Sequence, residues 1–386
     1  MSNQQTGPDS SVALLVADGY DMVLRSGHLV IRCLPYLAPS GLRRDGQLVL
    51  PVTVIEGVLT DATDHRIWFA GEEPRDENGG TLATLDPHDF GVGERAGFMM
   101  SFKPPSGAYA SLHDKIRQYA HILRNAAWQI DPTVADTRNG SYQVVPDDLP
   151  LVYPDTNTTR AGLITLNNLF RGHTIAIVGV GGTGSYVLDQ VAKTWVDRII
   201  LIDGDSLETH NAYRAPGAVA IDVLATQPNK AEYFAAEYGR MHSGITAHPV
   251  ALTAETLHLL EGSTFVFLAA ADAEARPVIM HWLRDRGVPF IDVGMSFREG
   301  EHGLTGMAKV SAYLPGDESP LPTAPSVPPG EDDYSSNIQL AELNALNAIL
   351  AVIRWKRYLG FYATHEESNL TVYKLFSNEI RNGDLE

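Results

Sequence analysis

One stretch of this 386-residue chain, GHTIAIVGVGGTGS at residues 172–185, constrains its fold more than any other. An apolar run ends at Gly179, and an amphipathic segment with apolar residues at helical spacing begins at Tyr186. Further glycines stand at positions 181, 182 and 184. A strand, a glycine turn and a helix in this order predict a nucleotide-binding unit.

Each glycine of this turn has its own physical role in such a unit. Gly179 permits the tight turn, Gly181 lets the backbone approach a phosphate, and Gly184 lets the helix pack on the strand. The helix N-terminus offers unpaired N–H groups and a partial positive charge to an anion. The other loop residues expected beside the phosphate are Gly182, Thr183 and Ser185. Alone, the motif fits binders of NAD, FAD and ATP alike.

Strand and helix patterns alternate between residue 172 and about residue 312. Buried-strand patterns follow at residues 198–203, 265–270 and 289–293, and helical patterns at residues 230–238 and 275–286. This alternation predicts an α/β fold with a Rossmann-like, doubly wound and mainly parallel sheet. We further expect a helix over residues 338–359, capped by Ser335 or Ser336 and stopped by Gly360, and a last strand over 371–376 at a sheet edge.

The residues before this region predict a smaller α+β domain over residues 12–130, to which we assign no function. Strand-like runs cover residues 29–34, 47–55 and 66–70. One helix face is formed by Leu112, Ile116, Tyr119, Leu123 and Ala127. Residues 131–160 are predicted to be a linker, and residues 161–386 the second domain. Within it, the proline-rich, acidic residues 315–333 predict a mobile loop.

Charge and composition exclude several classes of protein. The chain has 29 basic and 47 acidic residues and a net charge of −18, which disfavours a nucleic-acid partner. Its one cysteine, Cys33, leaves no intrachain disulfide and no Cys-based zinc cluster, so no zinc is expected, and a buried, inert thiol is favoured. Because no signal core and no apolar run of about 20 residues is present, we expect a cytoplasmic protein without membrane contact.

Charged side chains after the second and third strands narrow the choice of nucleotide. Asp203 ends the second strand of the region, where a carboxylate can accept hydrogen bonds from a ribose. The residues that follow read D-x-D-x-x-E-x-x-N-x-x-R from Asp203, a lysine comes 16 residues later, and D-x-x-x-R follows the next strand. The charged and polar positions are Asp203, Asp205, Asn211, Arg214, Lys230, Asp272 and Arg276.

With these residues the chain resembles the ThiF/MoeB adenylyltransferase family, which has the adenylation fold of ubiquitin-activating enzymes. Order, spacing and strand context agree over roughly residues 160–312, with a further portion to about residue 362. The chain departs from the family pattern at Ala215, where the family has Gln, and at Ala273, where it has Asn. Neither change removes a charge. The catalytic cysteine and the paired CxxC motifs of many relatives are absent after residue 160.

The resemblance implies an enzyme that uses ATP and Mg²⁺ to form an acyl adenylate and pyrophosphate. It implies that Arg214 and Lys230 hold the phosphates and that Asp272 binds Mg²⁺. It also implies a ribose contact for Asp203 and a phosphate or sugar contact for Asn211, with Asp205 in the same cofactor-binding run.

The resemblance also suggests a homodimer in which an arginine before the glycine turn reaches the neighbouring subunit's site, and Arg160 is the candidate. The expected partner is a ubiquitin-like protein with an exposed C-terminal tail, with conjugating or deconjugating enzymes as further partners. The N-terminal domain loosely resembles domains fused to bacterial ThiF-type proteins near ubiquitin-like genes.

Other interpretations remain open at this point. The enzyme could adenylate a short peptide or a small carboxylate, or the chain could bind nucleotide or partner without catalysis; an NAD-linked oxidoreductase is a further alternative. Simpler structural roles also stay open for single residues: a solvated strand end at Asp203 and Asp205, a surface position for Lys230, an ion-pair partner in Arg276 and a linker charge in Arg160.

Overall fold

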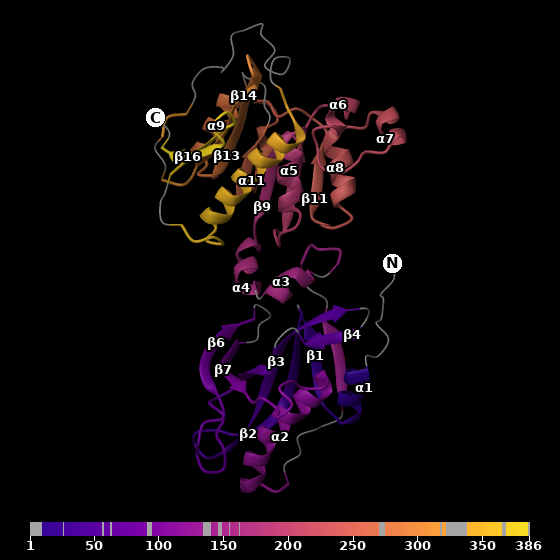
Figure 1. Cartoon of the computed structure of the whole chain (residues 1–386), viewed down its shortest axis with the longest axis vertical. Helices are drawn as coiled ribbons and strands as arrows, with labels where there is room; N and C mark the ends of the chain where they lie inside the picture. Colours follow the sequence, from indigo (N-terminus) through magenta and orange to yellow (C-terminus); the bar gives the residue numbers. More distant parts are fainter. Residues whose placement is uncertain are drawn as a thin grey trace. The chain divides into compact units, whose positions relative to one another are not determined.

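The computed structural model of the chain forms two compact units (Figure 1). The first comprises residues 1–148 and 154–168, and the second residues 149–153 and 169–386. The residues that the structure describes are 10–25, 27–55, 58–61, 64–90, 95–133, 140–145, 149–153, 155–161, 163–269, 275–316, 319–321, 338–364 and 368–384.

The first unit is built on a sheet in the order β6-β7-β5-β3-β2-β1-β8, with β4 paired to β3 outside this path. Its strands are β1 (Asp21–Arg25), β2 (His28–Leu37), β3 (Arg43–Ile55), β4 (Val58–Asp61), β5 (Arg66–Ala70), β6 (Thr84–Asp89), β7 (Arg95–Ser101) and β8 (Ser141–Val145). Its helices are α1 (Ser10–Ala17), α2 (Leu112–Ile130), α3 (Thr156–Ala161) and α4 (Ile164–Asn167). A 3₁₀ helix, η1 (Asn168–Phe170), leads into the second unit.

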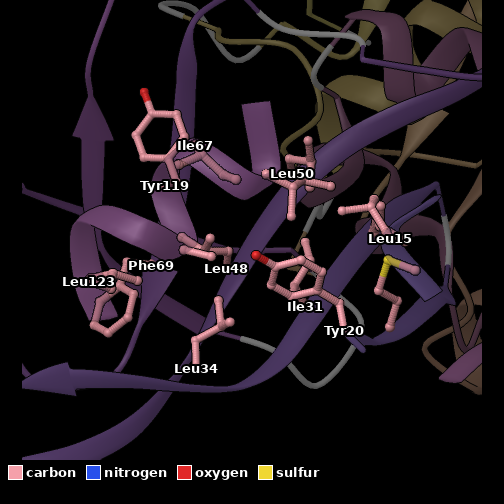
Figure 2. Close-up of a cluster of buried hydrophobic side chains, with 14 of the residues drawn as sticks. Leu15, Tyr20, Ile31, Leu34, Leu48, Leu50, Ile67, Phe69, Tyr119 and Leu123 are labelled. Carbon is pink, nitrogen blue, oxygen red and sulfur yellow. The ribbon is translucent and has the colours of Figure 1, made fainter. Parts of the chain in front are cut away.

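The core of the first unit lies between α1, α2 and one face of the sheet. Helix α2 buries the five residues that the sequence predicts for its apolar face. They pack against alternate residues of the central strands, because successive strand side chains point to opposite faces. Figure 2 shows this cluster, with Leu48 and Leu50 of β3 near Ile31 of β2. The prediction of an α+β N-terminal part is confirmed.

Two details of this unit differ from the sequence-based expectations. Within residues 131–160, assigned above to a linker, β8 pairs in parallel with β1, Ser141 beside Asp21, and so belongs to the sheet. Cys33 is exposed rather than buried. The reason is an irregularity in β2 between Ile31 and Leu34, where the residue register shifts and Cys33 adopts φ +57°.

The second unit contains a sheet in the order β11-β10-β9-β12-β13-β14-β15-β16. The first five strands in this order are parallel, and the last three extend the sheet with antiparallel pairs. The parallel strands are β9 (Thr174–Val178), β10 (Arg198–Ile202), β11 (Ile245–His248), β12 (Phe265–Leu268) and β13 (Phe290–Gly300). The others are β14 (Gly303–Tyr313), β15 (Leu370–Lys374) and β16 (Glu379–Gly383).

Helices cover both faces of this sheet, as the predicted doubly wound α/β fold requires. On one face α9 buries Ile279 and Leu283 against Val266 and Leu268 of β12. On the other face Trp355 of α11 packs on Phe265 and Phe267, and α5 lies beside α11 (Figure 1). The helices are α5 (Thr183–Val191), α6 (Thr209–Ala212), α7 (Ile221–Thr226), α8 (Lys230–Tyr238), α9 (Ala275–Asp285), α11 (Ala341–Tyr358) and the 3₁₀ helix η2 (Leu257–Leu260).

The strand order creates a switch point beside β9. The chain leaves β9 for β10 on one side and later enters β12 on its other side. In open α/β sheets, ligands bind at the carboxyl ends of the strands at such a point. The glycine turn directly follows β9 and therefore lies there.

The C-terminal part of this unit differs in detail from the sequence prediction. Strand β13 runs to residue 300 and forms a long hairpin with β14, which the sequence analysis did not predict. Helix α11 begins after Leu340 rather than at a serine cap, and β15 is covered by β16 and is not the edge strand. Gly360 follows the end of α11 with φ +81°, as a helix stop requires. The predicted mobile loop 315–333 falls mostly outside the described residues. Among the described helices, none is long and apolar enough to cross a bilayer.

His242 holds residues 149–153, a short segment that belongs to the second unit although it precedes the strands of that unit in the sequence. Leu151 pairs with His242, which is fully buried. Its Nδ1 accepts a hydrogen bond from the backbone N–H of Gly244 at 3.1 Å. The other ring nitrogen, Nε2, therefore carries the proton and donates to the Val196 carbonyl at 2.8 Å. Burial lowers the pKa of His242 below its ordinary value of 6.5, so the folded state holds a neutral ring.

This buried neutral ring predicts a loss of stability in mild acid. As pH falls below about 6.5, the unfolded chain takes up a proton at His242 and the folded chain does not, so the free energy of unfolding decreases. When the pH is lowered from about 7.5 to about 5.5, we expect the free energy of unfolding to fall by about 1 kcal/mol more in the wild type than in His242→Gln. Urea unfolding at both pH values measures this difference. Equal losses in the two proteins would contradict the assignment.

Candidate functional site

The glycine turn brings α5 unusually close to the end of β9. Gly179 has φ +79°, a left-handed conformation that favours glycine, and its N–H donates to the Ile202 carbonyl of β10 at 2.8 Å. A Cβ atom on Gly184 would lie 1.8 Å from the carbonyl oxygen of Gly179. The predicted roles of these two glycines therefore have a direct geometric basis.

The middle of the turn has one packed glycine and one open glycine. A Cβ on Gly182 would lie 2.5 Å from Asn344 Nδ2 and 2.6 Å from Gln339 Oε1. A Cβ on Gly181 would meet no described atom within 4 Å. Gly182 is also the N-cap of α5 and makes no side-chain capping bond. The turn thus presents backbone, without a side-chain cap, at a helix N-terminus suited to an anion.

The two hydroxyl residues of the loop hold the turn rather than point away from the protein. The Ser185 hydroxyl lies 2.7 Å from the carbonyl oxygens of Gly181 and Gly182, to which it can donate. The Thr183 hydroxyl donates to Asn344 Oδ1 at 3.1 Å. Both side chains are buried, so any phosphate contact from this loop would come mainly from backbone N–H groups.

Asp203 connects the glycine turn to the chain that follows β10. Its Oδ2 accepts from the backbone N–H of Val180 at 2.8 Å, and its Oδ1 from that of Asp205 at 2.9 Å. Burial raises the pKa of Asp203, while these two hydrogen bonds and the positive charge of Lys230 oppose the rise. Asp203 is thus a buried bracing group rather than a solvated strand end.

Lys230 is held beside this carboxylate by the same segment. Its side chain is 8% exposed, and Nζ donates to Asp205 Oδ2 at 2.8 Å. The backbone N–H of Lys230 donates to the Asp205 carbonyl at 2.9 Å. The Asp205 side chain is 76% exposed, so this ion pair connects a buried cation to an accessible anion. Lys230 is therefore not the surface lysine of the alternative interpretation.

Asn211 and Arg214 lie on the segment between Asp205 and α7. Asn211 is buried and takes part in a local capping box, in which its Oδ1 accepts from the backbone N–H of Glu208 at 2.8 Å. Its amide nitrogen lies 3.1 Å from His210 Nε2. The Arg214 carbonyl accepts from Asn344 Nδ2 at 3.1 Å. The side chain of Asn211 thus makes local capping contacts, and the Arg214 backbone is attached to α11, while the nucleotide contact of Asn211 stays a prediction.

The remaining predicted residues are only partly described. Asp272 and the substituted position Ala273 lie outside the described residues, as does the side chain of Arg160 in α3. Arg276, at the start of α9, pairs with Asp292 of β13 at 3.0 Å, as its ion-pair interpretation requires. Burial raises the pKa of Asp292, and the charge of Arg276 opposes the rise. In the described part of the chain, no group of three His, Cys, Asp or Glu side chains could hold a metal.

Asn344 is the residue of this site that the sequence analysis missed. It is fully buried in α11 and contacts both Thr183 and the Arg214 carbonyl. A signal was present, because Asn344 and Asn347 interrupt an apolar helix at positions i and i+3. What they contact could not be read from one sequence, since the partners of Asn344 lie more than 100 residues away and that of Asn347 lies 53 residues away.

Comparison with known families identifies the second unit. Residues 157–379, more than half of the chain, match the ThiF family. This chain belongs to the ThiF family. The resemblance carried by the glycine turn and the D-x-D…N-x-x-R run is thus confirmed. Residues 10–156 match a domain described as a domain of unknown function (DUF6791).

Two characterised relatives of the ThiF-family chain match short segments. It is 40% identical over 55 residues to tRNA threonylcarbamoyladenosine dehydratase of Bacillus subtilis (strain 168), which is 14% of this chain and 20% of the relative. It is 30% identical over 134 residues to ubiquitin-like modifier-activating enzyme 5 of Caenorhabditis briggsae, 33% of this chain and 28% of the relative. The chain thus spans less than a third of either relative.

Two solved structures are similar to part of this chain. The E. coli MccB structure with ATP has a TM-score of 0.47 at 16% identity, covering 59% of this chain and 69% of that one. The PaaA structure has a TM-score of 0.46 at 17% identity, covering 58% and 76%. Likenesses at this level do not bear on the activity of the ThiF-family chain.

The packing of the turn predicts that one glycine-to-alanine change lowers stability and that another weakens ATP binding. Gly184→Ala would force Cβ against the Gly179 carbonyl, so we expect a destabilisation of about 2 kcal/mol or more. Gly181→Ala meets open space and should change stability by less than about 1 kcal/mol, yet its methyl group would obstruct close approach of a phosphate. Thermal unfolding and ATP titration calorimetry separate the two effects. A Gly181→Ala protein with unchanged ATP affinity would contradict the proposed cradle.

Proposed function

We propose that this ThiF-family chain is an adenylyltransferase that uses ATP to activate a C-terminal carboxylate as an acyl adenylate. The observation that carries the proposal is a continuous set of contacts from the glycine turn to a buried cation. Val180 bonds to Asp203, Asp203 bonds to Asp205, and Asp205 pairs with Lys230. An uncapped helix N-terminus and a cationic side chain are thereby held beside one strand switch point.

These groups suit transfer of an adenylyl group. An oxygen of the substrate carboxylate attacks the α-phosphorus of ATP, the bond to the β-phosphate oxygen breaks, and pyrophosphate leaves. Negative charge accumulates on phosphate oxygens, so the protein mainly has to position the reactants and supply positive charge. In this proposal Lys230 and Arg214 supply the charge, and the backbone at Gly181 and Gly182 binds phosphate.

Asp203 also has capacity left for the ribose. Each of its oxygens accepts one backbone hydrogen bond, and a carboxylate can accept about four in all. We propose that a ribose hydroxyl donates to it, as the resemblance implies. An amide or alkyl side chain at this position would weaken both the brace of the turn and the sugar contact.

We propose that Asp272 holds Mg²⁺, which would neutralise charge on the phosphates when it is bound. An acidic residue after β12 is suitably placed in the sequence, because β12 lies next to β9 in the sheet. Carboxylate oxygen is the ligand type that Mg²⁺ prefers. In this proposal the protein groups described above position the nucleotide at the same strand ends.

For the acceptor we favour the tail of a ubiquitin-like protein. Support comes from the similarity to a ubiquitin-like modifier-activating enzyme, although that match is partial. Similarity to a tRNA-modifying dehydratase suggests a nucleic-acid substrate instead. A net charge of −18 would repel tRNA phosphates, so it favours a protein tail. A short peptide or small carboxylate is the second candidate, since the phosphate site makes no distinction between acyl groups.

We further propose that the protein is cytoplasmic, where ATP is available, and that it forms a homodimer. In this arrangement Arg160 of one subunit would reach the neighbouring subunit's phosphates. The proposal for Arg160 derives from the family resemblance and its place just before the glycine turn.

The first test of this function is nucleotide binding. Removing the buried cation in Lys230→Ala should weaken ATP binding about tenfold or more, because a charge-assisted contact to phosphate is lost. Lys193→Ala is the control, since Lys193 is an exposed lysine paired with Asp189 on α5. Titration calorimetry with ATP and with NADH measures both. Stronger binding of NADH than of ATP would refute the proposal.

The second test concerns the reaction itself. Wild type should exchange pyrophosphate into ATP when mixed with a ubiquitin-fold protein that ends in Gly-Gly, and exchange should fall at least about a hundredfold in Asp272→Ala and Arg214→Ala. The matched control is the same partner without its terminal Gly-Gly. Exchange that survives both substitutions would overturn the residue assignment, and equal exchange with the truncated partner would favour another acceptor.

A further inference from the structure

One buried amide joins the two parts of the candidate site that come from distant segments. Asn344 has no exposed surface. Its Oδ1 accepts from the Thr183 hydroxyl at 3.1 Å, and its Nδ2 donates to the Arg214 carbonyl at 3.1 Å. Its Nδ2 would also be 2.5 Å from a Cβ on Gly182. The Asn344 side chain is therefore packed directly on the glycine turn and is also hydrogen-bonded to the backbone of Arg214.

The chemistry of these partners requires an amide. The Arg214 carbonyl can only accept a hydrogen bond, so the nitrogen of Asn344 must face it, and the oxygen then faces Thr183. No other side chain of this length both donates and accepts in this way. An amide buried on the inner face of a helix is costly unless it is bonded. Asn344 meets this condition through both of its polar atoms, and both of its partners belong to the candidate site.

We infer that Asn344 is a positioning residue, which holds the segment carrying Arg214 in register with the phosphate-binding turn. The inference depends on the proposed adenylyltransferase function, because it assumes that the Arg214 guanidinium and the turn act on one ATP molecule. Asn344 itself does not touch the nucleotide. It sets the separation of two groups that do, through the Arg214 backbone on one side and Thr183 on the other.

A neighbouring residue provides a matched control. Asn347 lies three residues further along α11, is equally buried, and donates through Nδ2 to the Gly294 carbonyl of β13 at 3.2 Å. It shares the residue type, the helix and the burial of Asn344, but bonds to a strand instead of the turn. A merely structural effect of removing a buried amide should therefore appear in both positions.

The test is a double-substitution cycle read out by ATP binding. Asn344→Ala should weaken ATP binding about tenfold in the wild-type background and less than about twofold in the Arg214→Ala background, because the guanidinium that it positions is then absent. Asn347→Ala should also lower the thermal midpoint, because one bond of a buried amide is lost, but should change ATP affinity less than about twofold. Titration calorimetry and thermal unfolding of the full chain give these values.

Asn344→Ser provides a second, uncharged variant if the alanine variant does not fold. A serine hydroxyl is too short to bond both Thr183 and the Arg214 carbonyl, so ATP binding should again fall about tenfold in the wild-type background and less than about twofold in the Arg214→Ala background. Equal losses in both Arg214 backgrounds, or an equal loss in Asn347→Ala, would overturn the inference and leave the proposed function intact. Wild-type protein that binds no ATP would instead overturn the proposed function and the inference with it.

Discussion

The candidate site depends on one buried carboxylate. Asp203 accepts a hydrogen bond from the glycine turn and another from the segment after β10, so it fixes two neighbouring strand ends to each other. Both bonds come from backbone N–H groups that would otherwise lack a partner near the end of the sheet. Burial raises the pKa of Asp203, and these two bonds and the positive charge of Lys230 oppose the rise. The positions of Val180, Asp205 and Lys230 all follow from this brace.

The part of the chain that follows the parallel strands also contributes to the candidate site. After β13 the chain turns back through β14 and later enters α11, which packs beside α5. Through Asn344 this helix contacts the glycine turn and the Arg214 segment. The candidate site of this ThiF-family chain is thus assembled from a parallel half, which contains the glycine turn and Lys230, and a C-terminal half, which contains Asn344.

Much of the second unit could be predicted from local patterns, because its strands are apolar runs bounded by glycine and its helices have regular apolar spacing. Strand β10 and helix α8 appear within about a residue of their predicted bounds. The β13–β14 hairpin was missed because Gly303 and Gly306 interrupt its second strand pattern, and their pairing with Gly300 and Phe297 forms only in three dimensions. Cys33 was misjudged for a similar reason, since a shift of register is not visible in composition.

The sequence by itself determined the nucleotide-binding turn, the acidic and basic residues after the strands, and the family to which they point. Those features are local: glycine is needed where backbone approaches backbone, and charge is needed where phosphate binds. Only the tertiary structure decided that Lys230 is buried against Asp205, that Arg276 pairs with Asp292, and that Asn344 joins the turn to the Arg214 segment. Hydrogen-bond partners far apart in the chain are chosen by packing, and one sequence carries no direct record of that choice.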